Sequence, residues 1–88
     1  FFFFLDGDSM APRIKDGDVI VASPSVPAVQ GQTAIVKLKA QIGVTCKIFR
    51  ADGNEIHLIP INENFPTKVY PRDELEWCLA VLCHVQLS

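Results

Sequence analysis

Short apolar runs separated by turn-forming residues restrict the fold of this chain more than any other feature. Turns rich in Gly, Pro, Asp and Asn recur at intervals of roughly 8–12 residues, and no stretch has a helical period of useful length. The sequence therefore predicts an all-β (mostly β) domain of about seven or eight strands, folded as a small, strongly curved sheet or partial barrel. The expected strands cover residues 1–5, 18–22, 32–39, 42–50, 55–60, 67–70 and 75–87.

The connections between these strands carry their own signals. Residues 40–41 are expected to form a tight hairpin connection, and residues 51–54 (ADGN) form the clearest hairpin turn. Residues 9–14 could form one helical turn, with Pro12 near its beginning. In the last strand, strict alternation predicts one shared face for Leu75, Trp77, Leu79, Val81, Cys83, Val85 and Leu87.

Composition limits the class of protein. Eighty-eight residues that are 49% hydrophobic suffice for one small domain with its own core. A net charge of −2 argues against binding nucleic acid through this chain alone. The odd number of cysteines, without CxxC spacing, is typical of buried thiols in the reducing cytoplasm, and no metal or cofactor site is indicated. Residues 1–5 are too short to span a membrane, and since no Met precedes them we expect residues upstream to be missing.

Ser9 lies on a tight turn between two apolar runs, where a hydroxyl could act as a nucleophile if the chain supplied a base. His57 and His84 occur singly inside strands, with no motif around them. Lys47 is different, because it interrupts an apolar strand and must reach water or lose its proton. A buried, neutral lysine is a competent general base, although an outward-facing lysine on an edge strand explains the same pattern.

Several short motifs occur in a fixed order along nearly the whole chain. They are GDSMAP at 7–12, DGDVIV at 16–21, Gly31, VTCK at 44–47 and LIPINENFP at 58–66. In this order and at this spacing, they resemble the C-terminal peptidase domain of the LexA, phage-repressor and UmuD group, the S24 serine peptidases.

The resemblance implies a curved, mostly β domain of the LexA C-terminal type, and a site. By resemblance, Ser9 is the nucleophile and Lys47 the unprotonated general base, so the chain would be a self-cleaving serine peptidase. The main-chain N–H groups of Asp8 and Ser9 would hold the oxyanion, while Met10 and Pro12 would shape the turn. The implied protein is a cytoplasmic repressor whose peptidase domain forms homodimers.

Two departures from the family pattern concern the surroundings of the site. Ile48 stands where the family often has an arginine, and Gln32 where it often has an acidic residue. Self-cleavage in the group occurs at an Ala-Gly or Cys-Gly bond upstream of the serine, and neither dipeptide occurs here. We therefore expect residues 1–88 to be a fragment, preceded by the cleavage segment and a DNA-binding domain. The implied partners are its own N-terminal segment, DNA and an activated recombinase filament of the RecA type.

Other functions remain open from the sequence. One is a UmuD-like subunit of an error-prone polymerase, and another is a catalytically silent dimerisation module of a repressor. A signal-peptidase-like protein also uses a serine and a lysine, but it would need a membrane anchor. For the dimer, we expect residues 77–87 to contribute to the interface.

Overall fold

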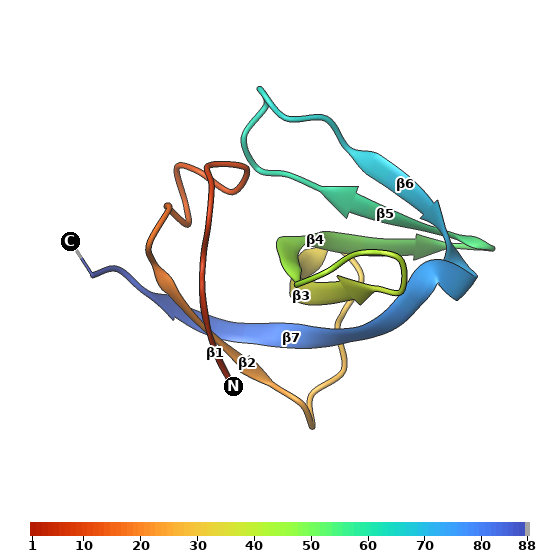
Figure 1. Cartoon of the computed structure of the whole chain (residues 1–88), viewed down its shortest axis with the longest axis horizontal. Helices are drawn as coiled ribbons and strands as arrows, with labels where there is room; N and C mark the ends of the chain where they lie inside the picture. Colours follow the sequence, from red (N-terminus) through yellow and green to blue (C-terminus); the bar gives the residue numbers. More distant parts are fainter. Residues whose placement is uncertain (88) are drawn as a thin grey trace.

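The computed structural model describes residues 1–87, and nearly all of its regular structure is β (Figure 1). The strands are β1 (Phe2–Phe4), β2 (Val19–Ser23), β3 (Gln32–Leu38), β4 (Thr45–Asp52), β5 (Glu55–Ile59), β6 (Lys68–Pro71) and β7 (Leu75–Val85). One turn of 3-10 helix, η1 (Arg72–Glu74), connects β6 to β7. The predicted all-β class and the number of strands are confirmed.

The seven strands form one sheet in the order β1-β2-β7-β3-β4-β5-β6, and every neighbouring pair is antiparallel. The sheet is strongly curved but not closed, since β1 and β6 are its two edges (Figure 1). The last strand, β7, inserts between β2 and β3, and so joins the beginning of the chain to its middle. This pairing brings the segment after β1 close to β4. The candidate site lies between these two parts of the chain.

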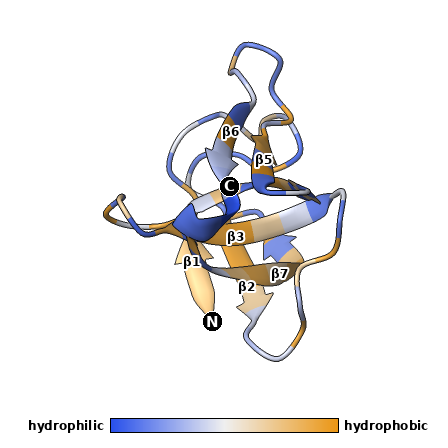
Figure 2. Cartoon of the chain, turned by 90° about the vertical axis from the view of Figure 1, so that its right-hand side faces the viewer, coloured by the Kyte–Doolittle hydropathy of each residue, from blue (hydrophilic) through white to orange (hydrophobic). Residues whose placement is uncertain are grey.

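Two apolar clusters form the core, and β3 contributes to both. Ile35 belongs to the first cluster, whereas Val36 belongs to the second, because successive strand residues point to opposite faces. Hydrophobic residues run along the strands, while most connections are hydrophilic (Figure 2). The first cluster consists of Leu5, Met10, Ile14, Ile20, Ala22, Ile35 and Cys46. The second consists of Ala34, Val36, Leu38, Phe49, Ile56 and Leu58.

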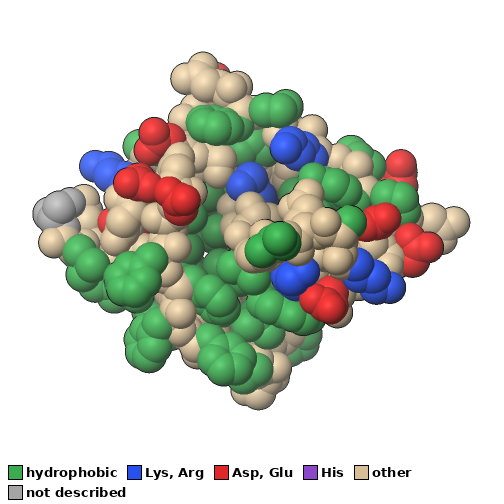
Figure 3. All heavy atoms as spheres, in the orientation of Figure 1, with side chains coloured by type: hydrophobic (Ala, Val, Ile, Leu, Met, Phe, Trp, Pro, Cys, Tyr) green, Lys and Arg blue, Asp and Glu red, His purple; other side chains and the backbone are tan. Residues whose placement is uncertain are grey.

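Not all apolar side chains enter these clusters. Phe2 and Phe4 on β1 are largely exposed, as is Leu82 on β7. Figure 3 shows hydrophobic side chains gathered on one face of the molecule, over β1 and β2. The same region holds an apolar hollow of about 390 Å³ that is lined by Phe1, Phe3, Val44, Trp77 and Leu79.

The predicted single apolar face of the last strand is wrong. The register of β7 shifts twice, opposite Val21/Ala22 of β2 and opposite Lys37/Leu38 of β3. Each shift adds a residue to one strand and reverses the alternation beyond it. As a result Leu75 packs against the second cluster, whereas Leu79 and Val81 pack against the first.

The tight hairpin predicted at residues 40–41 is also wrong. β3 ends at Leu38 and β4 begins only at Thr45, so the connection is longer. The ammonium of Lys37 holds this loop by donating hydrogen bonds of 2.6 Å to the carbonyls of Leu38 and Gln41. Gly43 lies within the loop at a φ of +84°, in the left-handed region that glycine adopts more readily than other residues.

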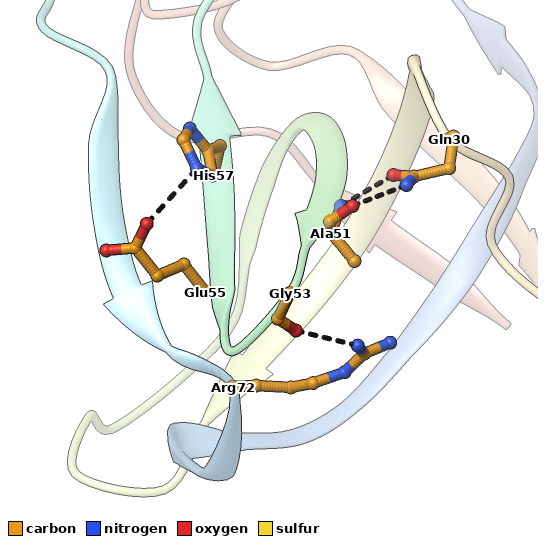
Figure 4. Close-up of polar contacts among 6 residues, drawn as sticks. All are labelled: Gln30, Ala51, Gly53, Glu55, His57 and Arg72. Carbon is orange, nitrogen blue, oxygen red and sulfur yellow. Dashed lines mark hydrogen bonds and ion pairs between the residues drawn. The ribbon is translucent and has the colours of Figure 1, made fainter.

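The hairpin turn predicted at residues 51–54 is confirmed, since Asp52 pairs directly with Glu55. Polar contacts fix both sides of this hairpin (Figure 4). The amide of Gln30 exchanges two hydrogen bonds of 2.5 Å with the backbone of Ala51, and the Arg72 guanidinium donates one of 3.0 Å to the Gly53 carbonyl. Residues 1–87 contain no helix with the length and apolarity needed to cross a membrane.

Candidate active site

The segment from Leu5 to Ile14 holds Ser9 at the surface by burying its neighbours. Met10 and Ile14 are almost fully buried in the first cluster, and a 3.0 Å hydrogen bond joins the N–H of Ile14 to the Met10 carbonyl. The N–H of Ala11 donates to the Asp8 carbonyl at 3.0 Å. The helical turn expected at residues 9–14 is thus a series of hydrogen-bonded turns, in which apolar anchors leave Ser9 half-buried.

The second turn, at residues 16–18, braces the first. The Asp16 carboxylate accepts a 2.7 Å hydrogen bond from the N–H of Gly7, which has a φ of +98° that side chains disfavour. The backbones of Leu5 and Asp18 are joined at 2.8 Å, and the buried Asp18 carboxylate accepts from the N–H of Lys15 at 2.9 Å. These contacts explain why aspartates flank the glycine in the DGD sequence.

Asn62 ties the serine turn to the loop after β5. Its side-chain amide donates to the Asp8 carbonyl at 3.0 Å, and its backbone N–H donates to the Ser9 carbonyl at 3.0 Å. The carbonyl oxygen of the same side chain accepts from the N–H of Asn64 at 3.0 Å. One asparagine therefore shapes its own loop and fixes the backbone on both sides of the serine Cα.

Lys47, on β4, reaches Ser9 directly. Its Nζ lies 2.9 Å from the Ser9 Oγ, 2.9 Å from the Thr45 Oγ1 and 3.2 Å from the Cys46 carbonyl oxygen. A neutral amine has two N–H groups and one lone pair, and Thr45 and Cys46 offer two acceptors. Lys47 can therefore donate to these two oxygens while its lone pair accepts the hydroxyl proton of Ser9.

The surroundings of Lys47 favour the neutral amine. Burial lowers the pKa of Lys47 below its ordinary value of 10.5. The Cys46 sulfur opposes this effect when ionised, whereas the charge of Lys68 lowers the pKa further. Burial raises the pKa of the Cys46 thiol to about 11, so this sulfur is uncharged at neutral pH.

The amides predicted to hold an oxyanion are available. Neither the Asp8 nor the Ser9 N–H donates a hydrogen bond to another group within residues 1–87, although the Asp8 carbonyl accepts two hydrogen bonds and the Ser9 carbonyl accepts one. Donors that are left free beside a nucleophile can stabilise a developing negative charge.

Ser9 and Lys47 open onto a groove of about 500 Å³. Its apolar side is made by Leu58, Phe65, Pro66 and Tyr70, from β5, β6 and the loop between them. An apolar groove beside a reactive hydroxyl suits an extended peptide, whose side chains can be buried along it. The remaining lining residues are Asp6, Gly7, Asp8, Gln41, Thr45 and Lys68.

The histidines considered as alternative bases lie elsewhere. Neither His57 nor His84 lines the groove around Ser9. The Nε2 atom of His57 lies 4.0 Å from a carboxylate oxygen of Glu55 (Figure 4). His84 is exposed on β7. The geometry therefore pairs Ser9 with Lys47 rather than with a histidine.

Three residues of the site were not assigned a role from the sequence. Thr45 could have been found, because it precedes Lys47 by two residues in a strand and so shares its face. Asn62 lies within a quoted motif, but its contact with the serine turn depends on the path of a loop. Lys68 carries no local signal, since it reaches the groove only through the register of β5 and β6.

Comparisons with known proteins identify the family of the chain. The sequence model of the Peptidase S24-like family matches residues 1–82. The LexA repressor of Cereibacter sphaeroides is 41% identical over 66 residues, which are 74% of this chain and 29% of that protein. The LexA repressor of Paramagnetospirillum magneticum is 37% identical over 73 residues, or 82% of this chain and 31% of that protein.

The prophage repressor CohE of Escherichia coli is 35% identical over 60 residues, or 68% of this chain and 27% of that protein. The chain thus spans less than a third of the length of these curated relatives. The match over residues 1–82 includes the serine turn, β4 with Lys47 and the groove. From this match and these relatives we conclude that the chain belongs to the Peptidase S24-like family.

Proposed function

We propose that this chain is the self-cleaving peptidase domain of a LexA-like or phage-repressor-like transcriptional regulator. Ser9 is the nucleophile, Lys47 the general base, and the N–H groups of Asp8 and Ser9 form the oxyanion hole. The observation that carries the proposal is the 2.9 Å contact between the Lys47 Nζ and the Ser9 Oγ, at a lysine whose pKa is lowered by burial. The relatives that are named repressors support the regulatory role.

The proposed reaction has two steps. The Ser9 Oγ attacks the scissile carbonyl carbon, its proton passes to the Lys47 Nζ, and the carbonyl oxygen becomes an oxyanion near the two free amides. When the C–N bond breaks, the Lys47 ammonium returns the proton to the leaving amine and an ester on Ser9 remains. Water then attacks the ester carbonyl carbon while Lys47 accepts a proton from it. When the C–O bond to Ser9 breaks, the Lys47 ammonium returns this proton to the Ser9 Oγ, which releases the acid and restores the hydroxyl.

The substrate in this proposal is an extended segment of the same protein, upstream of the domain, lying in the groove beside Ser9. A DNA-binding domain precedes that segment in the full-length regulator, and a recombinase filament promotes cleavage. The two LexA repressors, of which this chain covers 29% and 31%, are long enough to hold further segments of this kind.

Self-cleavage of the full-length protein tests the proposal. Wild type, Ser9→Ala and Lys47→Ala are incubated at neutral and alkaline pH, and fragments are identified by mass spectrometry. Wild type should cut itself faster as the pH rises, because the neutral fraction of Lys47 increases, and both variants should stay intact. Equal cutting by all three proteins would contradict the dyad, as would an intact wild type under every condition, including a recombinase filament.

We further propose that the domain forms a homodimer through residues 77–87. Leu82, Val85 and Leu87 in this segment are exposed and belong to neither core cluster, and a second copy of the chain could bury them. Analytical ultracentrifugation should show a dimer for the full-length wild type and a weaker one for Val85→Asp. A monomer at high concentration would contradict this part of the proposal.

A further inference from the structure

A second lysine, Lys68 on β6, projects into the same groove as Lys47. The register pairs Lys68 with Leu58, and Leu58 with Phe49. Directly paired residues point to the same side of a sheet, and so do residues two apart in one strand. Because Lys47 precedes Phe49 by two residues, both lysines lie on one face, and both line the groove.

Sheet geometry sets their separation. Neighbouring strands lie about 4.8 Å apart and each residue advances a strand by about 3.4 Å, so the two Cα atoms are roughly 12 Å apart. Each lysine carries a flexible four-carbon stem, and the two ammonium groups can approach each other across the groove. At such distances two like charges repel measurably when part of the path between them is protein.

The charge of Lys68 is not cancelled by a partner. Lys68 forms no ion pair within residues 1–87, where the ion pairs are those of Lys37 with Glu76 and of His57 with Glu55. The Cys46 thiol beside Lys47 is uncharged at neutral pH. The other titratable side chains facing the groove are Asp6 and Asp8, from the segment after β1, and Tyr70, from β6.

We infer that Lys68 is a positioning residue of the proposed dyad, whose ammonium repels a proton from Lys47 and so keeps the base neutral. The inference rests on the proposed function, since Lys68 acts only through Lys47. Burial is the main cause of the lowered pKa of Lys47, and the charge of Lys68 lowers it further. A second cation beside a buried lysine is a known way to obtain a neutral amine near neutral pH.

The first test is the pH profile of self-cleavage by the full-length protein. Lys68→Met should shift the rising limb to higher pH and reduce the rate at neutral pH by roughly three- to tenfold, with the alkaline plateau unchanged. Lys68→Arg keeps the positive charge and should retain the wild-type profile. Lys39→Met removes an exposed lysine that does not line the groove, and should also change nothing. An identical profile for Lys68→Met would overturn the inference.

The second test does not depend on cleavage. In full-length protein with ¹³C-labelled lysine Cε, the Lys47 signal is assigned by its loss in Lys47→Arg and is followed against pH. Its midpoint should move upward in Lys68→Met, and in wild type it should move upward with added salt, which screens Lys68. An unchanged midpoint overturns the inference even if wild type cleaves itself. A shifted midpoint supports it even if wild type is inert, a result that would count against the proposed function alone.

Discussion

Asn62 offers a sensitive test of how the serine is positioned. Replacing it with alanine removes two side-chain hydrogen bonds, one to the Asp8 carbonyl and one from the Asn64 N–H. Asn62→Asp keeps an oxygen for the Asn64 N–H, but it cannot donate to Asp8. The pair of variants therefore separates the shape of the loop from the tether to the serine turn.

The expected losses follow from the contacts. A net contribution of about 1 kcal/mol for each hydrogen bond predicts a loss of about 1 kcal/mol for Asn62→Asp and about 2 kcal/mol for Asn62→Ala. With a slope of about 1–3 kcal/mol/M in urea, these losses lower the unfolding midpoint by roughly 0.3–1 M for Asn62→Asp and roughly 0.7–2 M for Asn62→Ala. Self-cleavage should fall about tenfold in both variants, because a small displacement of a nucleophile costs much of its rate.

Two measurements on the full-length protein check this prediction: urea unfolding, followed by tryptophan fluorescence, and the rate of self-cleavage at alkaline pH. Asn64→Ala is the matched control, since Asn64 takes part through its backbone N–H and should keep both the stability and the rate. If Asn62→Asp cleaved at the wild-type rate, the tether to Asp8 would not position Ser9, and the reasoning would be refuted.

Three further predictions concern the core, the thiols and the lysine. Met10→Ala leaves a cavity at a fully buried position and should lower the free energy of unfolding, measured in urea, by about 2–5 kcal/mol. A decrease below about 1 kcal/mol would show that Met10 does not anchor the serine turn in the core. At pH 8, iodoacetamide should modify the buried Cys46, whose pKa of about 11 keeps it protonated, far more slowly in native protein than in urea-unfolded protein, as followed by mass spectrometry; equal rates would contradict its burial. Between the lowered pKa of Lys47 and 10.5 this residue binds more protons in the unfolded chain than in the folded one, so Lys47 contributes a rise of the free energy of unfolding with pH. Cys46, whose pKa burial raises from 9.0 to about 11, contributes a fall over that range in wild type and variant alike. Lys47→Met should abolish this rise, and an unchanged pH dependence would show that Lys47 does not cause it.

The parts of the fold that could be predicted from the sequence are those set by local signals. The turn at Gly53 followed directly from the ADGN sequence, and alternating apolar residues located most of the strands. The bulges in β7 could not be predicted, because they arise where β7 meets β2 and β3, which are distant in sequence. The long loop before Thr45 depends on the bonds that Lys37 makes within it.

The residues of the site fall into the same two groups, those with a local sequence signal and those without one. Lys47 stands out because a charged side chain within an apolar strand is unusual. A serine on a turn is common, and Ser9 becomes a candidate only through its pairing with Lys47 and the ordered motifs around both residues. Asn62 and Lys68 are ordinary residues locally, and they become part of the site only when the sheet brings β5, β6 and their loop next to the serine turn. Tertiary register, rather than residue type, gives them a role.

The central claim is that Lys47 activates the Ser9 hydroxyl, and a covalent serine probe measures this most directly. A fluorophosphonate, which transfers a phosphonyl group to an activated serine oxygen with loss of fluoride, is added to the full-length protein, and the modified residue is located by mass spectrometry. If Lys47 activates Ser9, the probe should modify Ser9 at a rate that rises with pH in wild type and is lost in Lys47→Met. Modification of Ser9 at the same rate in wild type and Lys47→Met would contradict this claim.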